Sequence, residues 1–163
     1  MKKALGLVVA AAALCAPARA DSLQTGISLY QQGRYAQAEA ALRQASGPEA
    51  SAYLAGALAK QKKYGEAEAK GKEALGANPA HPVAAAGLGE ALVGQRKFDE
   101  AVSRMTSVIQ AKPDVAYAYF WRAQAYQNLR QVARMVEDYQ MFLKLAPKAP
   151  EAASVQVLLA GMK

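Results

Sequence analysis

Cysteine and histidine are almost missing from this sequence, which holds one of each in 163 residues. Cys15 lies in an apolar stretch near the N-terminus, so the rest of the chain has no thiol for a disulfide or for Cys–His catalysis. His81 is the one histidine that a Ser–His–Asp arrangement could use, and we interpret it as a surface residue of the turn 78–82. Zinc sites need several such ligands, so we expect neither a metal nor a cofactor.

A glycine-rich phosphate loop is also missing, because the run Gly87-Leu88-Gly89 falls within an expected helix. Carboxylates do occur in close pairs, at Glu66 and Glu68, Asp99 and Glu100, and Glu137 and Asp138. We interpret these pairs as solvated charges near helix starts and not as an acid and a base. We therefore predict that the protein is not an enzyme, with a small envelope hydrolase using serine or carboxylate chemistry as an alternative.

Long apolar runs are absent beyond the first residues of the chain. Two N-terminal lysines precede an apolar stretch from Leu5 to Cys15, and the following Ala18-Arg19-Ala20 has small residues where signal peptidase reads them. A spanning helix needs about 20 apolar residues, and this stretch is shorter. We predict a signal peptide at 1–20 and a periplasmic or secreted mature chain at 21–163, with no stable membrane insertion after cleavage.

Strong charge is lacking as well. Loss of Lys2, Lys3 and Arg19 lowers the formal net charge from +7 to +4, which gives no support for a nucleic-acid partner. The basic residues gather at Lys60, Lys62, Lys63, Lys70 and Lys72, with Glu66 and Glu68 among them. This cluster could contact an acidic protein or an anionic envelope polymer, but a solvated helix end is the favoured interpretation.

What the sequence does contain is an internal repeat. Pro79, Pro113 and Pro147 are 34 residues apart, and each closes a similar block. The same interval separates the upstream positions Tyr64, Phe98 and Val132, and an earlier copy begins 29 residues before Tyr64, at Tyr35. A 34-residue period with a closing proline resembles the tetratricopeptide repeat.

The resemblance implies an all-α fold, an α-solenoid of about four helical hairpins with a C-terminal capping helix. The repeats would cover residues 21–47, 48–81, 82–115 and 116–148, and the capping helix 149–161. Small residues are needed where helices cross, and we assign Gly26, Ala55, Gly89 and Ala123 to the first helices and Ala38, Ala67 and Ala101 to the second. Gly71 stands where the family has an aromatic residue, and we expect it to loosen the second repeat.

In this family the first helices line a concave groove that binds ligands. The lining positions here are Tyr30, Gln31, Tyr53, Gly56, Lys60, Glu90, Tyr117, Phe120, Trp121, Gln124, Gln127 and Asn128. Mixed aromatic and amide side chains suit peptide recognition, so we select Tyr53, Tyr117, Phe120, Trp121, Gln124 and Asn128 as candidate peptide-binding residues. The alternative is that the face at 117–128 packs beneath the capping helix.

Two further features follow from the family pattern. Arg122 and Asp138 occupy places where the family often has a structural ion pair. The clamp of Lys, Asn and Arg that binds a terminal carboxylate in chaperone-tail readers is absent, since its positions hold Leu23, Ile27, Ala52, Gly56, Val83 and Gly87.

These observations favour a scaffold or adaptor that binds a partner protein or peptide in the cell envelope through its concave groove. A structural subunit of an envelope assembly, held by its convex faces, is the alternative. The identity of the partner and the oligomeric state stay open.

Overall fold

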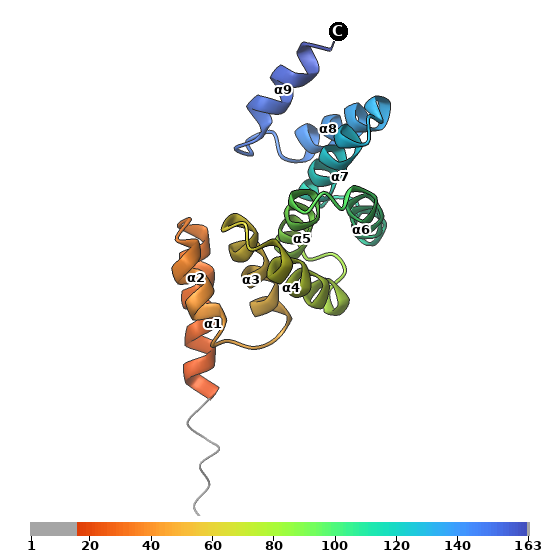
Figure 1. The fold of residues 1–163 in the computed structure, drawn as a ribbon. Coiled ribbons are helices and arrows are strands. Elements are labelled where there is room, and N and C mark those ends of the chain that lie inside the picture. Colours follow the sequence, from red (N-terminus) through yellow and green to blue (C-terminus); the bar gives the residue numbers. More distant parts are fainter. Residues whose placement is uncertain (1–15, 163) are drawn as a thin grey trace, which may run out of the picture.

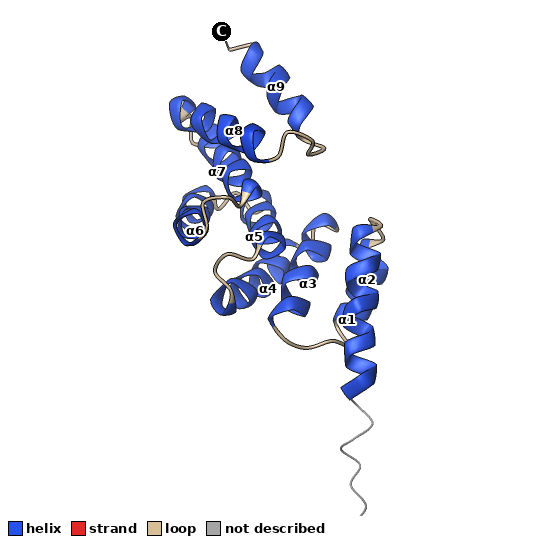
Figure 2. Ribbon diagram, turned by 180° about the vertical axis from the view of Figure 1, so that it is seen from behind, coloured by secondary structure: helices blue, strands red, loops and turns tan. Residues whose placement is uncertain are grey.

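The computed structural model describes residues 16–162, and within that range the chain is helical with no strand (Figure 2). The helices are α1 (Ala16–Gln31), α2 (Tyr35–Leu42), α3 (Pro48–Lys60), α4 (Tyr64–Ala77), α5 (Pro82–Gly94), α6 (Phe98–Ala111), α7 (Ala116–Asn128), α8 (Val132–Leu145) and α9 (Ala152–Ala160). The expected all-α fold is confirmed. No helix between residues 16 and 162 combines the length and apolar character that a bilayer crossing requires.

The helices form four hairpins that follow one another along a curved stack (Figure 1). The first helices are neighbours in the stack, because α3 packs against both α1 and α5, and α5 packs against α7. Each second helix of the first three hairpins packs against the first helix of the next one, as α4 does on α5. Helix α9 packs against α8 and ends the stack. The expected α-solenoid with a C-terminal capping helix is therefore present.

Helix α1 begins within the predicted signal peptide. It starts at Ala16, so the predicted cleavage point before Asp21 lies inside the helix. The rest of the predicted signal peptide, residues 1–15, lies outside the described residues.

Each hairpin turns through one residue with left-handed backbone. Gly33 takes this place in the first hairpin, with φ of 74°, and Lys62, Arg96 and Arg130 take it in the others, with φ of 61°, 61° and 58°. The next residue donates its N–H to a carbonyl five positions back, as from Lys63 to Leu58 at 3.0 Å, which closes the helix end. The turns are thus set by backbone hydrogen bonds.

Small residues lie at the helix crossings, as expected. Ala38, Ala67 and Ala101 in the second helices have no exposed surface, and neither do Ala55 and Ala123 in the first helices. With no side chain beyond Cβ at these positions, neighbouring helices approach closely enough to exclude water.

The expectation that Gly71 loosens the second repeat is wrong. A Cβ atom added at Gly71 would lie 2.8 Å from the Cβ of Leu88 and 3.3 Å from its Cα. Helix α5 therefore comes unusually close to α4 at this glycine. The same holds between α3 and α5, where a Cβ at Gly87 would lie 2.7 Å from the backbone nitrogen of Gly56.

Candidate functional site

A groove with a volume of about 630 Å³ lies on the concave side, where α1, α5 and α7 face the start of α9. We call it the concave groove. Its aromatic lining is Tyr30, Tyr35, Tyr117 and Trp121, and its charged lining is Lys60, Glu90 and Glu151. Side chains of α5 such as Val83 and Ala86 also line it. The concave groove therefore combines an apolar surface with a few charged groups, as ligand sites commonly do.

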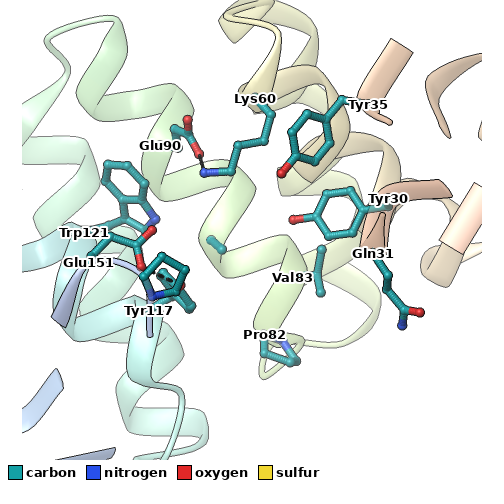
Figure 3. Close-up of a pocket in the computed structure, with 12 residues that line it drawn as sticks. Tyr30, Gln31, Tyr35, Lys60, Pro82, Val83, Glu90, Tyr117, Trp121 and Glu151 are labelled. Atoms are coloured by element: carbon teal, nitrogen blue, oxygen red, sulfur yellow. Dashed lines mark hydrogen bonds and ion pairs between the residues drawn. The ribbon is translucent and has the colours of Figure 1, made fainter. Parts of the chain in front are cut away.

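One wall of the concave groove is built around Tyr30. Its ring packs edge to face against Tyr35, with centroids 5.6 Å apart, and against Tyr53, with centroids 5.4 Å apart. A Cβ at Gly56 would lie 2.8 Å from the hydroxyl of Tyr30, so the absence of a side chain there lets the ring lie on α3. Figure 3 shows the hydroxyls of Tyr30 and Tyr35 pointing into the open space of the groove.

The opposite wall comes from α7 and the residues before α9. Tyr117 donates a hydrogen bond to Oε2 of Glu151 over 2.8 Å. Trp121 lies against α5, where a Cβ at Gly89 would be 2.5 Å from the Cβ of Trp121. The indole Nε1 of Trp121 is buried and has no hydrogen-bond partner among the described residues.

An ion pair lies between the two walls. Lys60 of α3 lies 2.8 Å from the carboxylate of Glu90 on α5, and Figure 3 shows the pair beside the aromatic rings. The Lys60 side chain is 36% exposed, so solvent weakens this attraction and the pair adds little to stability.

Burial raises the pKa of two phenols of the groove above the ordinary value of 10.0, which itself lies well above neutral pH. Desolvation raises the pKa of Tyr30 to about 12, with smaller contributions from Tyr35 and Glu90. Desolvation also raises the pKa of Tyr117, and its hydrogen bond to Glu151 adds to that increase. Both hydroxyls are therefore hydrogen-bond donors at neutral pH.

Two of the six candidate peptide-binding residues, Tyr117 and Trp121, line the concave groove. Phe120 and Gln124 instead line a separate hollow of about 410 Å³, together with Val155 of α9. Phe120 is only 5% exposed, so much of its ring belongs to the core. The capping helix thus covers part of the face at 117–128 and leaves the Tyr117 side open.

The other two candidate residues are not part of the lining of the concave groove. The ring of Tyr53 lies between those of Tyr30 and His81, with centroids 5.4 Å and 6.1 Å away. Asn128 is exposed at the end of α7 and donates a hydrogen bond to the carbonyl of Gln124 over 2.9 Å.

Sequence reasoning missed several lining residues, among them Tyr35 and Glu151. Tyr35 begins a second helix, and Glu151 precedes the capping helix, so neither occupies a lining position of a first helix. The only signal in the sequence for Tyr35 is that it is aromatic and begins a second helix.

The interpretation of His81 as a surface turn residue is wrong. His81 is 7% exposed, and its Nδ1 accepts a hydrogen bond from the N–H of Ala84 over 3.3 Å at the start of α5. Its Nε2 lies 3.0 Å from a carboxylate oxygen of Glu49. His81 therefore caps a helix and ties α5 to α3.

The expectation that the acidic pairs are solvated is wrong for Glu68. It is 9% exposed and accepts hydrogen bonds from Lys72 over 2.6 Å and from Gln95 and Lys97 over 2.7 Å. Burial acts to raise its pKa, but these three donors outweigh burial and lower the pKa to about 2. Glu68 is thus a buried link between the second and third hairpins.

Glu39 makes the same link one hairpin earlier. It is 8% exposed and accepts hydrogen bonds from Gln61 over 2.8 Å and from Lys63 over 2.7 Å. Burial again acts to raise the pKa, and the donors Lys63, Arg43 and Gln61 lower it to about 2. We call Glu39, Glu68 and their donors the carboxylate links.

The basic cluster is largely neutralised by acidic neighbours. Its ion pairs are Lys60 with Glu90, Lys63 with Glu39, Lys70 with Glu73, and Lys72 with Glu68 and Glu100. The surface between 60 and 72 therefore offers little free positive charge to an anionic partner.

The expected pair of Arg122 and Asp138 is confirmed. The Nε–H and Nη2–H groups of Arg122 donate hydrogen bonds to Oδ2 and Oδ1 of Asp138, each over 2.7 Å. Asp138 is 4% exposed. Arg122 also donates to the hydroxyl of Thr106 over 3.0 Å, so it links α7 to both α8 and α6. Within residues 16–162, no three His, Cys, Asp or Glu side chains gather as metal ligands would.

Comparison with known proteins gives a consistent result. Three sequence models described as tetratricopeptide repeat match residues 23–82, 58–125 and 117–149. No curated protein matches the sequence significantly.

Several solved structures share the fold. A thermophilic tetratricopeptide repeat protein of Thermus thermophilus has a TM-score of 0.74 at 22% identity, over 86% of this chain and 82% of that chain. PilF of Pseudomonas aeruginosa has a TM-score of 0.69 at 22% identity, over 90% and 71%. MamA of AMB-1 has a TM-score of 0.63 at 22% identity, over 88% and 90%. At these identities the likeness concerns the fold alone.

Proposed function

We propose that this chain, in which tetratricopeptide repeat models match residues 23–82, 58–125 and 117–149, is a scaffold that holds a segment of a partner protein in the concave groove. The observation that carries the proposal is the set of four aromatic side chains from α1, α2 and α7 around one open hollow. Such rings supply apolar contact area at a low cost in side-chain entropy.

The polar groups of the concave groove suit the backbone of a bound segment. The phenol hydroxyls of Tyr30 and Tyr35 point into the hollow, where they can donate hydrogen bonds to a ligand. A peptide carbonyl beside these donors would gain hydrogen bonds that a purely apolar ligand could not form. These donors favour a peptide over a lipid chain as the occupant.

The test is to fill the groove with a larger side chain and to measure whether a partner is still captured. Ala86 lies in the lining on α5, so Ala86→Trp places a large side chain in the hollow. Ala69 of α4 is exposed and is not part of that lining, so Ala69→Trp is a matched control. We expect affinity capture from the native envelope to lose its partner with Ala86→Trp only.

Retention of the same partner by a folded Ala86→Trp variant would contradict the proposal. Circular dichroism of both variants establishes that each is folded. Loss of the partner with both variants would also contradict it, because the binding surface would then extend beyond the concave groove.

We further propose that the mature protein acts in the periplasm or is secreted. The lysines, apolar stretch and small residues of positions 1–20 support this location. Cleavage before Asp21 would remove residues 16–20 of α1 and leave the helix from Asp21 to Gln31. N-terminal sequencing of the exported protein tests the proposal, and a chain that keeps residues 1–20 in the cytoplasm would contradict it.

A further inference from the structure

We infer that the concave groove selects a partner segment that presents a positively charged side chain, above all arginine, to Glu151, Tyr117 and Trp121. The inference rests on the proposed function and adds the chemistry of the ligand. It follows from the charge of the groove, the state of Glu151 and the free aromatic faces.

The charge of the concave groove is opposite to that of the chain. Residues 21–163 carry a formal net charge of +4, whereas the ionised groups of the groove are Glu90, Glu151 and Lys60, a net charge of −1. Lys60 already neutralises Glu90 over 2.8 Å. The remaining negative charge therefore belongs to Glu151 and favours a cation in the groove.

Glu151 has no cationic partner among the described residues, because no lysine, arginine or histidine nitrogen there lies within 4.0 Å of its carboxylate. Its one hydrogen bond comes from the neutral phenol of Tyr117. Glu151 also precedes α9 without its side chain capping that helix. The carboxylate is thus turned toward the groove, and Figure 3 shows it beside Tyr117 and Trp121.

Aromatic faces in this protein readily accept guanidinium groups. Outside the groove, Arg122 lies 5.7 Å from the ring of Tyr119, Arg134 lies 5.7 Å from Tyr126, and Arg96 lies 5.9 Å from Phe98. None of the four groove rings has such a cation over it within the described residues. Tyr117 packs against Phe142, and Trp121 packs against Phe120 and α5, so only the parts of these two rings that line the concave groove are available to a cation from a ligand.

Arginine fits this arrangement better than lysine. Its planar guanidinium stacks on an aromatic face and at the same time donates two parallel hydrogen bonds to a carboxylate. Glu151 beside Trp121 offers both kinds of contact in one place. An acidic side chain would instead be repelled by the unpaired charge of Glu151.

Trp121 provides a direct signal for the test, because it is the only tryptophan in the chain. The probes are acetylated and amidated peptides with the same alanine and proline flanks and a central arginine, citrulline or glutamate. Citrulline keeps the shape of arginine and removes its charge. We expect the arginine peptide to shift Trp121 emission and to bind at least about tenfold more tightly than the citrulline peptide.

Variants assign that preference to Glu151. We expect Glu151→Gln to remove the difference between arginine and citrulline, and Glu137→Gln, an exposed carboxylate on α8, to keep it. Circular dichroism confirms that each variant is folded.

Equal affinity for the arginine and citrulline peptides would overturn the inference and leave peptide binding in the concave groove intact. Tighter binding of the glutamate peptide, or an arginine preference that survives Glu151→Gln, would overturn it as well. Failure of every peptide to bind, while a partner is still captured in an Ala86-dependent way, would reject the cation without rejecting the groove.

Discussion

Tyr117 on α7 and Glu151 before α9 are joined by a hydrogen bond of 2.8 Å across the edge of the concave groove. Helix α9 packs mainly on α8, so this bond is a separate attachment of the segment that precedes it. The bond therefore holds the Glu151 carboxylate at the edge of the groove.

Removal of that phenol should loosen the start of α9. We expect Tyr117→Phe to lower the free energy of unfolding by about 1 kcal/mol and to speed amide exchange in residues 149–155. Tyr35→Phe is the matched control, since no hydrogen bond of its hydroxyl is found among the described residues, and it should change neither quantity. Urea unfolding and hydrogen exchange measure the two effects.

An added methyl group at Gly87 should destabilise the protein although alanine favours helices. Its Cβ would lie 2.7 Å from the nitrogen of Gly56 and 2.8 Å from the carbonyl carbon of Ala55, so α3 and α5 would have to move apart. We expect Gly87→Ala to cost about 1–3 kcal/mol in urea unfolding.

The control is Gly76→Ala in α4, where nothing lies within 4 Å of the added Cβ. We expect that variant to gain up to about 1 kcal/mol from helix propensity. Equal effects at Gly76 and Gly87 would show that the close contact between α3 and α5 is not formed.

Loss of the buried ion pair should be costly. Asp138→Ala leaves the Arg122 guanidinium, whose side chain is 17% exposed, without its carboxylate. We expect a loss of about 3–5 kcal/mol in thermal or urea unfolding. Glu73→Gln is the comparison, because it breaks the exposed pair with Lys70 and keeps an amide oxygen to accept the hydrogen bond of Ser51, so it should cost less than about 0.5 kcal/mol.

The carboxylate links should make stability fall in acid. The pKa values of Glu39 and Glu68 are lowered in the folded chain from 4.5 to about 2. Their stabilisation is therefore complete above about pH 4.5 and is lost as the pH falls toward 2. We expect urea midpoints to decline over this interval, and the decline to be smaller in a Glu39→Gln, Glu68→Gln double variant. An unchanged pH dependence in that variant would contradict the assignment.

The repeat made most of the fold predictable, because each closing proline and each buried alanine recurs at one interval. Arg122 and Asp138 could be paired for the same reason, since both sit at defined places in one hairpin. Glu68 could not be predicted, because its donors Gln95 and Lys97 belong to the next hairpin. The expectation that acidic residues near helix starts are solvated considers only the helix that carries the carboxylate, and it leaves out donors from a neighbouring hairpin.

The candidate site was predictable in part. Tyr117 and Trp121 follow from their places on a first helix, and they line the concave groove. Phe120, next to Trp121 in sequence, is instead covered by α8 and α9, and the capping helix has no repeat pattern that would place it. Glu151 escaped prediction because its position depends on how the chain turns after Pro147.

The glycine contact between α3 and α5 has a mechanical consequence. Backbones that touch at Gly56 and Gly87 have no side-chain layer between them that could compress or slide, so the two middle hairpins should move as a single body. Any widening of the concave groove must then come from movement of its two ends, which are the first hairpin with Tyr30 and the C-terminal segment with Glu151. A bound segment would be contacted from both of these ends, while the two middle hairpins keep their relative position.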